Sequence, residues 1–253
     1  MTLWQHQRPF RHFRAHDVLE GHDYRRLCEL FRQIQDGSTA LSYRMARTSR
    51  NYDARVVAVD ERLAGLLDPL FAPAWLSSLG RLLGFPPADV IDGALHSSPA
   101  GSRDGWIHTD LCPAWFDESR PSGTVRFPDR LRCEYFTGRP LHPDARPVEY
   151  IRAAALIYFL CNDGWEAGDG GETGLYAAAR HAACTTFTSV PPVNNSLLFF
   201  ECSPHSYHRF LSNPGRERNS VILWLHCTVE QAKTLWGETS IAPRAHSRAA
   251  GLA

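Results

Sequence analysis

Lysine is almost absent from this sequence of 253 residues, since Lys233 is the only lysine among 27 basic residues. Any cation that the fold needs in its interior must therefore be an arginine. Net charge is lacking as well, because 27 acidic residues balance the basic ones. A neutral chain lacks the basic surface that general nucleic-acid binders and binders of anionic membranes need. We therefore expect no nucleic-acid partner and no membrane partner.

Long apolar runs and paired cysteine motifs are missing too. No segment approaches the roughly 20 apolar residues of a transmembrane helix, and residues 1–6 lack the apolar core of a secretory signal. The seven cysteines are odd in number, and no two of them form a Cys-x-x-Cys pair. We expect free thiols in a reducing cytoplasm and no structural zinc site.

The residues that are present divide the chain near Pro86. Residues 1–16 are basic and aromatic without periodicity, which predicts an irregular arm. Helical periodicity begins at Asp23 and returns in residues 60–84, where two prolines break it into pieces. The sequence therefore predicts a mostly helical buttress over residues 1–85.

Beyond Pro86 the pattern changes to short apolar runs separated by turn residues, which is typical of a sandwich or a jelly-roll barrel. The predicted strands are Val90–His96, Trp106–Asp110, Ala153–Cys161, Thr185–Val190, Ser196–Glu201, His205–Leu211 and Ser220–His226. We expect a barrel core over residues 86–230, interrupted by a long insertion at 111–150 over one mouth. Residues 231–253 are predicted to form a mobile tail on what we expect to be one structural unit.

The motif His108-Thr109-Asp110 carries the first metal-binding signal. In an extended segment, residues i and i+2 project to the same face, so this imidazole and this carboxylate can converge on one point. With a distant imidazole they would form the facial triad that holds non-haem Fe(II) and leaves coordination positions open. A short His-x-Asp motif also occurs by chance, so the rest of the sequence has to supply the other parts.

Two histidines in the later strand region, His205 and His208, are candidates for the third ligand. They are three residues apart, so in a strand they face opposite sides and only one can reach the metal. We predict His208, because the apolar strand 196–201 and the turn at Pro204 aim the chain at it. His205 stays the alternative.

Arg218 and Ser220 lie two residues apart at the start of the next apolar strand and so share a face. A guanidinium beside a hydroxyl is a good receptor for a carboxylate, because its planar fork makes two charge-assisted hydrogen bonds. The alternative is an ordinary exposed arginine at a strand end.

Together, the His-x-Asp motif, the distant histidine and the Arg-x-Ser motif resemble the Fe(II)- and 2-oxoglutarate-dependent dioxygenases, most closely the prolyl-hydroxylase-like group. Residues 156–165 (LIYFLCNDGW) and 170–176 (GGETGLY) are similar to the strand, tryptophan and Gly-Gly-Glu segment of that group. The resemblance covers residues 104–227. It implies a mainly β fold with α-helices, in which a double-stranded β-helix (jelly-roll, cupin-like) core is buttressed by the N-terminal helices.

The resemblance also implies a metal site and a reaction. His108, Asp110 and His208 would bind Fe(II), and the enzyme would use 2-oxoglutarate as cosubstrate and O2, with release of succinate and CO2. Halogenating relatives replace the carboxylate with Ala or Gly. The presence of Asp110 therefore implies hydroxylation or desaturation.

For the cosubstrate, the resemblance implies that Arg218 pairs with the distal carboxylate of 2-oxoglutarate, with Ser220 beside it. Tyr158 matches a tyrosine that helps to hold the same carboxylate, and Phe159 is the alternative one residue later.

The insertion at 111–150 is predicted to select the substrate. It follows Asp110 directly, and the candidate substrate contacts are Trp106, Trp115 and Phe116. Its arginines and carboxylates balance, which fits a solvated loop as well as an anion-binding lid. We expect a small-molecule substrate, such as an amino acid or a natural-product intermediate, because a compact chain without a peptide-binding accessory domain suits a closed pocket.

Other functions also fit these residues. A hydroxylase of a protein residue is the alternative enzyme. A non-catalytic cupin-like protein could bind or sense 2-oxoglutarate with the same barrel. A zinc-dependent hydrolase could use two histidines and one aspartate, but it would not need Arg218 and Ser220. The sequence makes no prediction of the oligomeric state.

Overall fold

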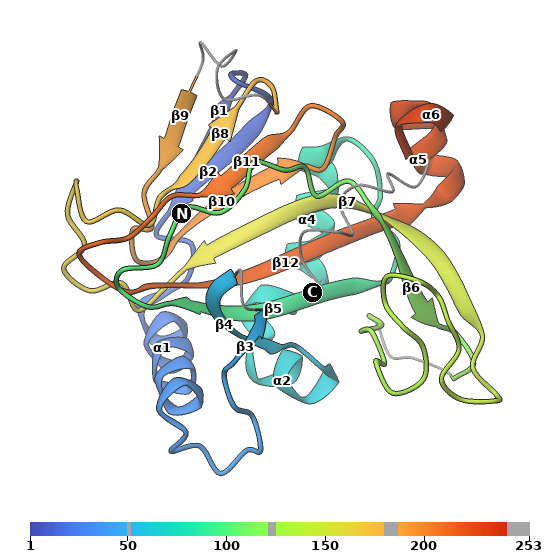
Figure 1. Cartoon of the computed structure of the whole chain (residues 1–253), viewed down its shortest axis with the longest axis horizontal. Helices are drawn as coiled ribbons and strands as arrows, with labels where there is room; N and C mark the ends of the chain where they lie inside the picture. Colours follow the sequence, from blue (N-terminus) through green and yellow to red (C-terminus); the bar gives the residue numbers. More distant parts are fainter. Residues whose placement is uncertain (50–51, 121–124, 180–186, 242–253) are drawn as a thin grey trace.

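Figure 1 shows the computed structural model, which describes residues 1–49, 52–120, 125–179 and 187–241. Its strands are β1 (Thr2–His6), β2 (His12–His16), β3 (Ala46–Ser49), β4 (Tyr52–Ala58), β5 (Ile91–Ser98), β6 (Pro113–Asp117), β7 (Pro147–Phe159), β8 (Thr173–Tyr176), β9 (Phe187–Val190), β10 (Ser196–Glu201), β11 (Tyr207–Phe210) and β12 (Arg218–Thr228). Its helices are α1 (Gly21–Asp36), α2 (Glu61–Leu66), α3 (Asp68–Phe71), α4 (Pro73–Leu83), α5 (Val229–Trp236) and α6 (Glu238–Ile241).

Two antiparallel sheets form the core. The larger sheet has nine strands in the order β1-β2-β10-β7-β12-β5-β4-β3, and β6 pairs with the first half of β7. The smaller sheet has the order β11-β8-β9. The long strands β7 and β12 pair over most of their length and form the centre of the larger sheet.

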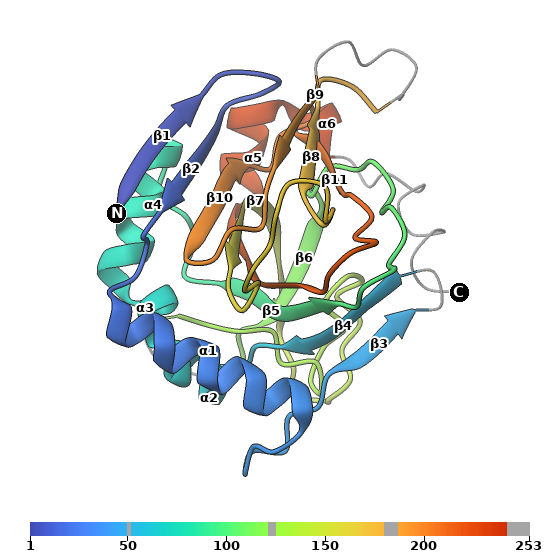
Figure 2. The same cartoon turned by 90° about the vertical axis from the view of Figure 1, so that its left-hand side faces the viewer.

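Helices α1 to α4 lie along the outer face of the larger sheet, and the smaller sheet lies on its inner face (Figure 2). Alternate residues of each strand point to opposite faces, which gives the sheet two apolar surfaces. The outer core joins the helices to Leu156, Tyr158 and Val221, whereas the inner core contains Ile157, Phe159 and residues of the smaller sheet.

Local chemistry explains where the helices begin and end. The helix α1 buries Leu27, Phe31 and Ile34, which recur at helical spacing, and it ends at Gly37, whose φ of 76° is open to glycine. The helix α2 begins where the side chain of Asp60 accepts a hydrogen bond from a backbone amide of the first turn. Among the described residues, no helix is long and apolar enough to cross a membrane.

The structure corrects the prediction for the N-terminus. Residues 1–16 form the hairpin β1–β2 instead of an irregular arm, and β2 extends the larger sheet by pairing with β10. Phe13 lies opposite Phe199 in that pairing, so the partner strand is distant in the sequence and no local pattern reveals it. The N-terminal buttress therefore contributes strands to both edges of the sheet as well as its helices.

Two other predicted segments differ. Residues 106–110 form no strand and make only one bridge, between His108 and His208. The predicted tail begins with helices α5 and α6, and α5 packs on the ends of β7 and β12. Residues 242–253 of that tail, and residues 185 and 186 of a predicted strand, lie outside the described residues.

Candidate metal centre

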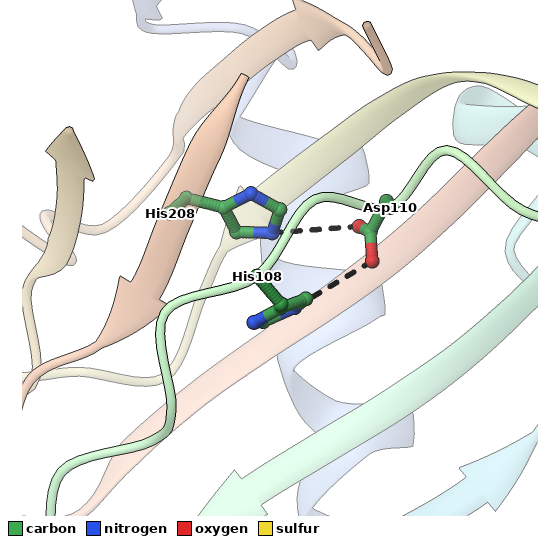
Figure 3. A group of neighbouring side chains, drawn as sticks. All are labelled: His108, Asp110 and His208. Atoms are coloured by element: carbon green, nitrogen blue, oxygen red, sulfur yellow. Dashed lines mark ion pairs between the residues drawn. The ribbon is translucent and has the colours of Figure 1, made fainter. Parts of the chain in front are cut away.

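Three side chains of the predicted triad meet between the two sheets. One nitrogen of His108, one nitrogen of His208 and a carboxylate oxygen of Asp110 all lie within 4.8 Å of one another. The Nε2 atoms of His108 and His208 lie 3.6 Å and 3.5 Å from the two oxygens of Asp110 (Figure 3). His205 is exposed on the preceding turn and is not part of this group.

The backbone fixes both imidazoles in the same tautomer. Nδ1 of His108 lies 2.9 Å from the carbonyl oxygen of Trp106, and Nδ1 of His208 lies 3.1 Å from that of Ser206. A carbonyl only accepts, so each Nδ1 carries the proton and each Nε2 presents its lone pair to the centre. Hydrogen bonds of this kind orient histidines that bind metals.

Two residues of the larger sheet, Trp224 and Arg152, hold the side chain of Asp110 in place. The indole Nε1 of Trp224 donates a hydrogen bond of 2.8 Å to Oδ2 of Asp110. The guanidinium of Arg152 stacks on the Trp224 ring at 4.1 Å, and its Nη1 lies 4.0 Å from Oδ1 of Asp110. Trp224 thus fixes the orientation of the carboxylate, whose two oxygens each face one of the imidazoles.

The charges of the centre follow from this geometry. Burial raises the pKa of Asp110, but His208, His108 and Arg152 outweigh it and hold that pKa well below its ordinary value. Burial lowers the pKa of His208, but Asp110 overcomes this effect and the pKa is raised. Burial and the neighbouring His208 lower the pKa of His108. Asp110 is therefore an anion at neutral pH, as a ligand for a cation must be.

Arg218 lies on the same inner face, toward the start of β12. Its side chain is buried, its Nη2 donates to Oγ1 of Thr173 at 3.4 Å, and its Cζ lies 5.1 Å from the Phe159 ring. Ser220 shares this face, as predicted from its spacing. Its buried Oγ has no hydrogen-bond partner within the described parts of the chain. A buried hydroxyl without a partner is costly unless a ligand satisfies it.

The structure contradicts the predicted role of Tyr158. Its ring belongs to the outer core beneath the helices, and its hydroxyl donates to Oδ1 of Asn195 at 2.8 Å. Phe159, the alternative, faces Arg218 on the inner side. The error has a physical cause, because a shift of one residue moves a strand side chain to the opposite face.

Sequence reasoning missed His96 on β5, which pairs with Ser220 across the sheet. Its ring centroid lies 6.5 Å from that of Trp224, and the charges of Arg218 and Asp110 both act on its pKa, so it lies near the Arg218 region and near the triad. Burial and then the charge of Arg218 lower its pKa to about 3, so this imidazole is neutral at physiological pH. The alternation of side chains along β5 is a sequence signal that could have indicated that His96 faces the site.

Arg152 was also missed, because an irregular register brings it to the inner face. Leu225 of β12 pairs with Ala154, but the next residue, His226, pairs with Arg152, so Ala153 is skipped. Such a β-bulge re-aims the side chains that follow it and is frequent beside active sites. Arg152 then reaches Asp92, to whose Oδ2 its Nη2 donates at 3.1 Å.

The insertion closes over Arg152. The hydroxyl of Tyr135 accepts from Nε of Arg152 at 3.1 Å and lies 3.0 Å from Nε2 of His226. Nδ1 of His226 faces the carbonyl of Val90, so Tyr135 is the donor to Nε2. The predicted position of the insertion at one end of the barrel therefore has a structural basis in these contacts.

The three predicted substrate contacts separate in the structure. Trp106 is 45% exposed and its ring centroid lies 6.0 Å from that of His108, so it borders the centre. Phe116 is fully buried against Tyr135 inside the insertion, and Trp115 packs on the backbone of Gly138. Neither Phe116 nor Trp115 lies with the triad, because β6 runs along β7 and places Phe116 in the buried cluster of Tyr135 and Trp115 against Gly138.

The residues fit a ferrous ion with a chelating cosubstrate. Two imidazole nitrogens and one carboxylate oxygen are the donor set of the non-haem Fe(II) facial triad. The unpartnered hydroxyl of Ser220 and the buried guanidinium of Arg218 match the needs of a carboxylate on the same face.

Comparison with known proteins supports this interpretation. Residues 134–226 match the family model of the 2OG-Fe(II) oxygenase superfamily, a segment that contains His208 and Arg218. No curated protein matches the chain by sequence.

Solved structures show the fold. A prolyl-4-hydroxylase of Pseudomonas putida is 18% identical with a TM-score of 0.56, over 85% of this chain and 91% of that one. A prolyl hydroxylase of Trichoplax adhaerens, solved with a hypoxia-inducible-factor peptide fragment, is 14% identical with a TM-score of 0.54, over 88% and 86%. The non-haem alpha-ketoglutarate-dependent epimerase SnoN of nogalamycin biosynthesis is 11% identical with a TM-score of 0.55, over 86% and 77%.

These similarities confirm the predicted jelly-roll core of two facing sheets. The fold, the family match over residues 134–226 and the His-Asp-His group between the sheets make this chain similar to the 2OG-Fe(II) oxygenase superfamily, whose enzymes use Fe(II), 2-oxoglutarate and O2.

Proposed function

We propose that this protein is an Fe(II)- and 2-oxoglutarate-dependent oxygenase that hydroxylates or desaturates an unactivated C–H bond of a small molecule, such as an amino acid or a natural-product intermediate. His108, Asp110 and His208 would hold the iron, with Arg218 and Ser220 binding the distal carboxylate of 2-oxoglutarate. The observation that carries the proposal is the convergence of both Nε2 lone pairs and one Asp110 oxygen on a single point.

Each residue has a separate task. The carbonyls of Trp106 and Ser206 keep the two imidazoles aimed at the metal. Trp224 donates to Oδ2 of Asp110 and so holds the carboxylate in its orientation toward the two imidazoles. Arg218 neutralises the distal carboxylate of the cosubstrate, and Phe159 and Ile222 exclude water around it.

Bound Fe(II) would activate O2 with 2-oxoglutarate, so that one oxygen atom enters succinate as CO2 leaves and the other oxidises the substrate. Asp110 fills the position that a halide would need, which favours hydroxylation or desaturation over halogenation.

A protein-residue hydroxylase remains the alternative, because two of the similar structures are prolyl hydroxylases. The small-molecule proposal rests on the insertion, whose Tyr135 accepts a hydrogen bond from Arg152 and so covers the end of the inner face away from Arg218. An insertion that covers the site suits a small ligand better than an extended peptide.

The test is succinate formation by the iron-loaded protein with two libraries, one of amino acids and small metabolites and one of proline-containing peptides. We expect stimulation by a member of the first library and its loss in Asp110→Ala. Stimulation by peptides alone would establish the alternative. Binding of 2-oxoglutarate without succinate formation under any of these conditions would contradict catalysis and indicate a sensor.

A further inference from the structure

A second polar site lies in the insertion, apart from the triad. A cavity of about 600 Å³ is lined by Ser119, Arg120, Arg132, His142, Asp144 and Arg146 among its residues. Its volume falls in the range of small-ligand pockets. None of the triad residues lines it, and nothing in the proposed reaction uses it. We call it the arginine pocket.

One buried carboxylate, that of Asp117, holds three lining residues of the arginine pocket together. Asp117, at the end of β6, accepts hydrogen bonds from Ser119 N at 3.0 Å, Ser119 Oγ at 2.7 Å and Arg146 N at 2.7 Å. It also accepts from Nε of Arg132, and Nη2 of Arg132 donates to Ser119 Oγ at 2.8 Å. These contacts tie three separate segments together before any ligand arrives, which reduces the entropy lost on binding.

The charges of the pocket are only partly balanced. Arg132 is 5% exposed and is paired with Asp117. Within the described residues, Arg120 and Arg146 form no ion pair, whereas Arg139 of the same insertion is paired with Glu134. Asp144, the one lining carboxylate, lies 3.7 Å from Nδ1 of His142. The lining therefore has three arginines and one carboxylate, and Arg120 and Arg146 have no ion-pair partner within the described residues.

Guanidinium groups bind oxyanions through parallel, charge-assisted hydrogen bonds, and phosphate is their typical tetrahedral ligand. We propose that the arginine pocket binds a phosphate group, carried by a small phosphorylated molecule, at a site separate from the iron centre. Arg120 and Arg146 contact the phosphate oxygens, and the buried Arg132 holds the wall beside them. The volume leaves room for an organic portion next to the phosphate.

The test is calorimetric titration of the metal-free protein with inorganic phosphate at constant ionic strength. We expect saturable binding that weakens at least about tenfold in Arg146→Gln and in Arg120→Gln, as the loss of a charge-assisted contact predicts. Arg139→Gln is the matched control, because it removes an arginine of the same insertion that already has a partner. Circular dichroism would verify that all three variants fold.

The proposal is overturned by the absence of saturable phosphate binding to the wild-type protein, or by equal affinity in wild type and Arg146→Gln. Acetate at the same ionic strength tests for general attraction of anions, and binding as strong as that of phosphate would also overturn it. Glycerol phosphate tests the organic portion, and tighter binding than inorganic phosphate would support a phosphorylated molecule as the ligand. The titration needs neither iron nor 2-oxoglutarate, so its result is independent of the proposed function.

Discussion

Two buried arginines lie at opposite ends of the inner face, and their surroundings differ. Arg152 lies in a network in which Asp92, Tyr135 and His226 all make hydrogen bonds with protein groups. Beside Arg218, the hydroxyl of Ser220 has no partner within the described residues. The Arg152 end is a completed internal network, whereas the Arg218 end keeps a polar group for a ligand. We therefore propose that arginine in the interior serves the fold at one end and binds the cosubstrate at the other.

The largest effect on stability is expected at the Arg152 end, where the hydrogen-bond network is complete. Asp92→Ala would leave Arg152 buried without its carboxylate and should lower the free energy of unfolding by about 3–5 kcal/mol. Urea denaturation measures this loss. Asp68→Asn is the control, because its ion pair with Arg26 is exposed and should change stability by less than about 1 kcal/mol. A similar small loss in Asp92→Ala would remove the distinction between the two ends.

At the Arg218 end, a substitution should weaken the binding of 2-oxoglutarate. Arg218→Gln should weaken 2-oxoglutarate binding by about 10–100-fold, since a hydrogen bond to a charged group contributes about 1.5–3 kcal/mol, and should leave metal affinity unchanged. Anaerobic calorimetry measures both. Arg216→Gln is the matched control, because this neighbouring arginine pairs with Asp169 in the turn. Equal losses in the two variants would contradict the assignment of Arg218.

Trp224 joins the two ends, because it stacks on Arg152 and donates to Asp110. Trp224→Phe keeps most of the ring but removes the donor, so metal affinity should fall by roughly tenfold, as for other partners of metal ligands. Titration with Co(II) as a spectroscopic probe measures this change. Trp236→Phe is the control, because it removes an indole donor that binds Glu201 and not a metal ligand. Its metal affinity should equal that of the wild type.

The smallest effect is expected for Ser220→Ala. Removing a hydroxyl without a partner should leave stability unchanged or slightly higher, while 2-oxoglutarate affinity falls by about 2–10-fold. Thermal unfolding and calorimetry measure the two quantities. Destabilisation by more than about 1 kcal/mol would show that Ser220 serves the fold, which would erase the contrast with Arg152.

The sequence predicted the parts of the site that depend on local spacing. His108 and Asp110 share a face because they are two residues apart, and Arg218 and Ser220 do so for the same reason. The regular strands β10 and β12 were also predicted close to their observed bounds.

The sequence could not predict features that depend on distant pairing or on register. Tyr158 was assigned to the wrong face, since the choice between it and Phe159 rests on which residue of β12 lies opposite. Arg152 escaped notice because the skipped residue Ala153 has no signature of its own. The hairpin β1–β2 gains its place from β10, a strand almost two hundred residues later.

The most direct test of the central claim compares His208→Ala with His205→Ala. The two histidines are three residues apart, but only His208 lies with His108 and Asp110. The anaerobic protein with Fe(II) and 2-oxoglutarate should show a weak visible charge-transfer band. We predict that His208→Ala loses this band and that His205→Ala keeps it at wild-type intensity. A band that survives in His208→Ala would contradict the triad.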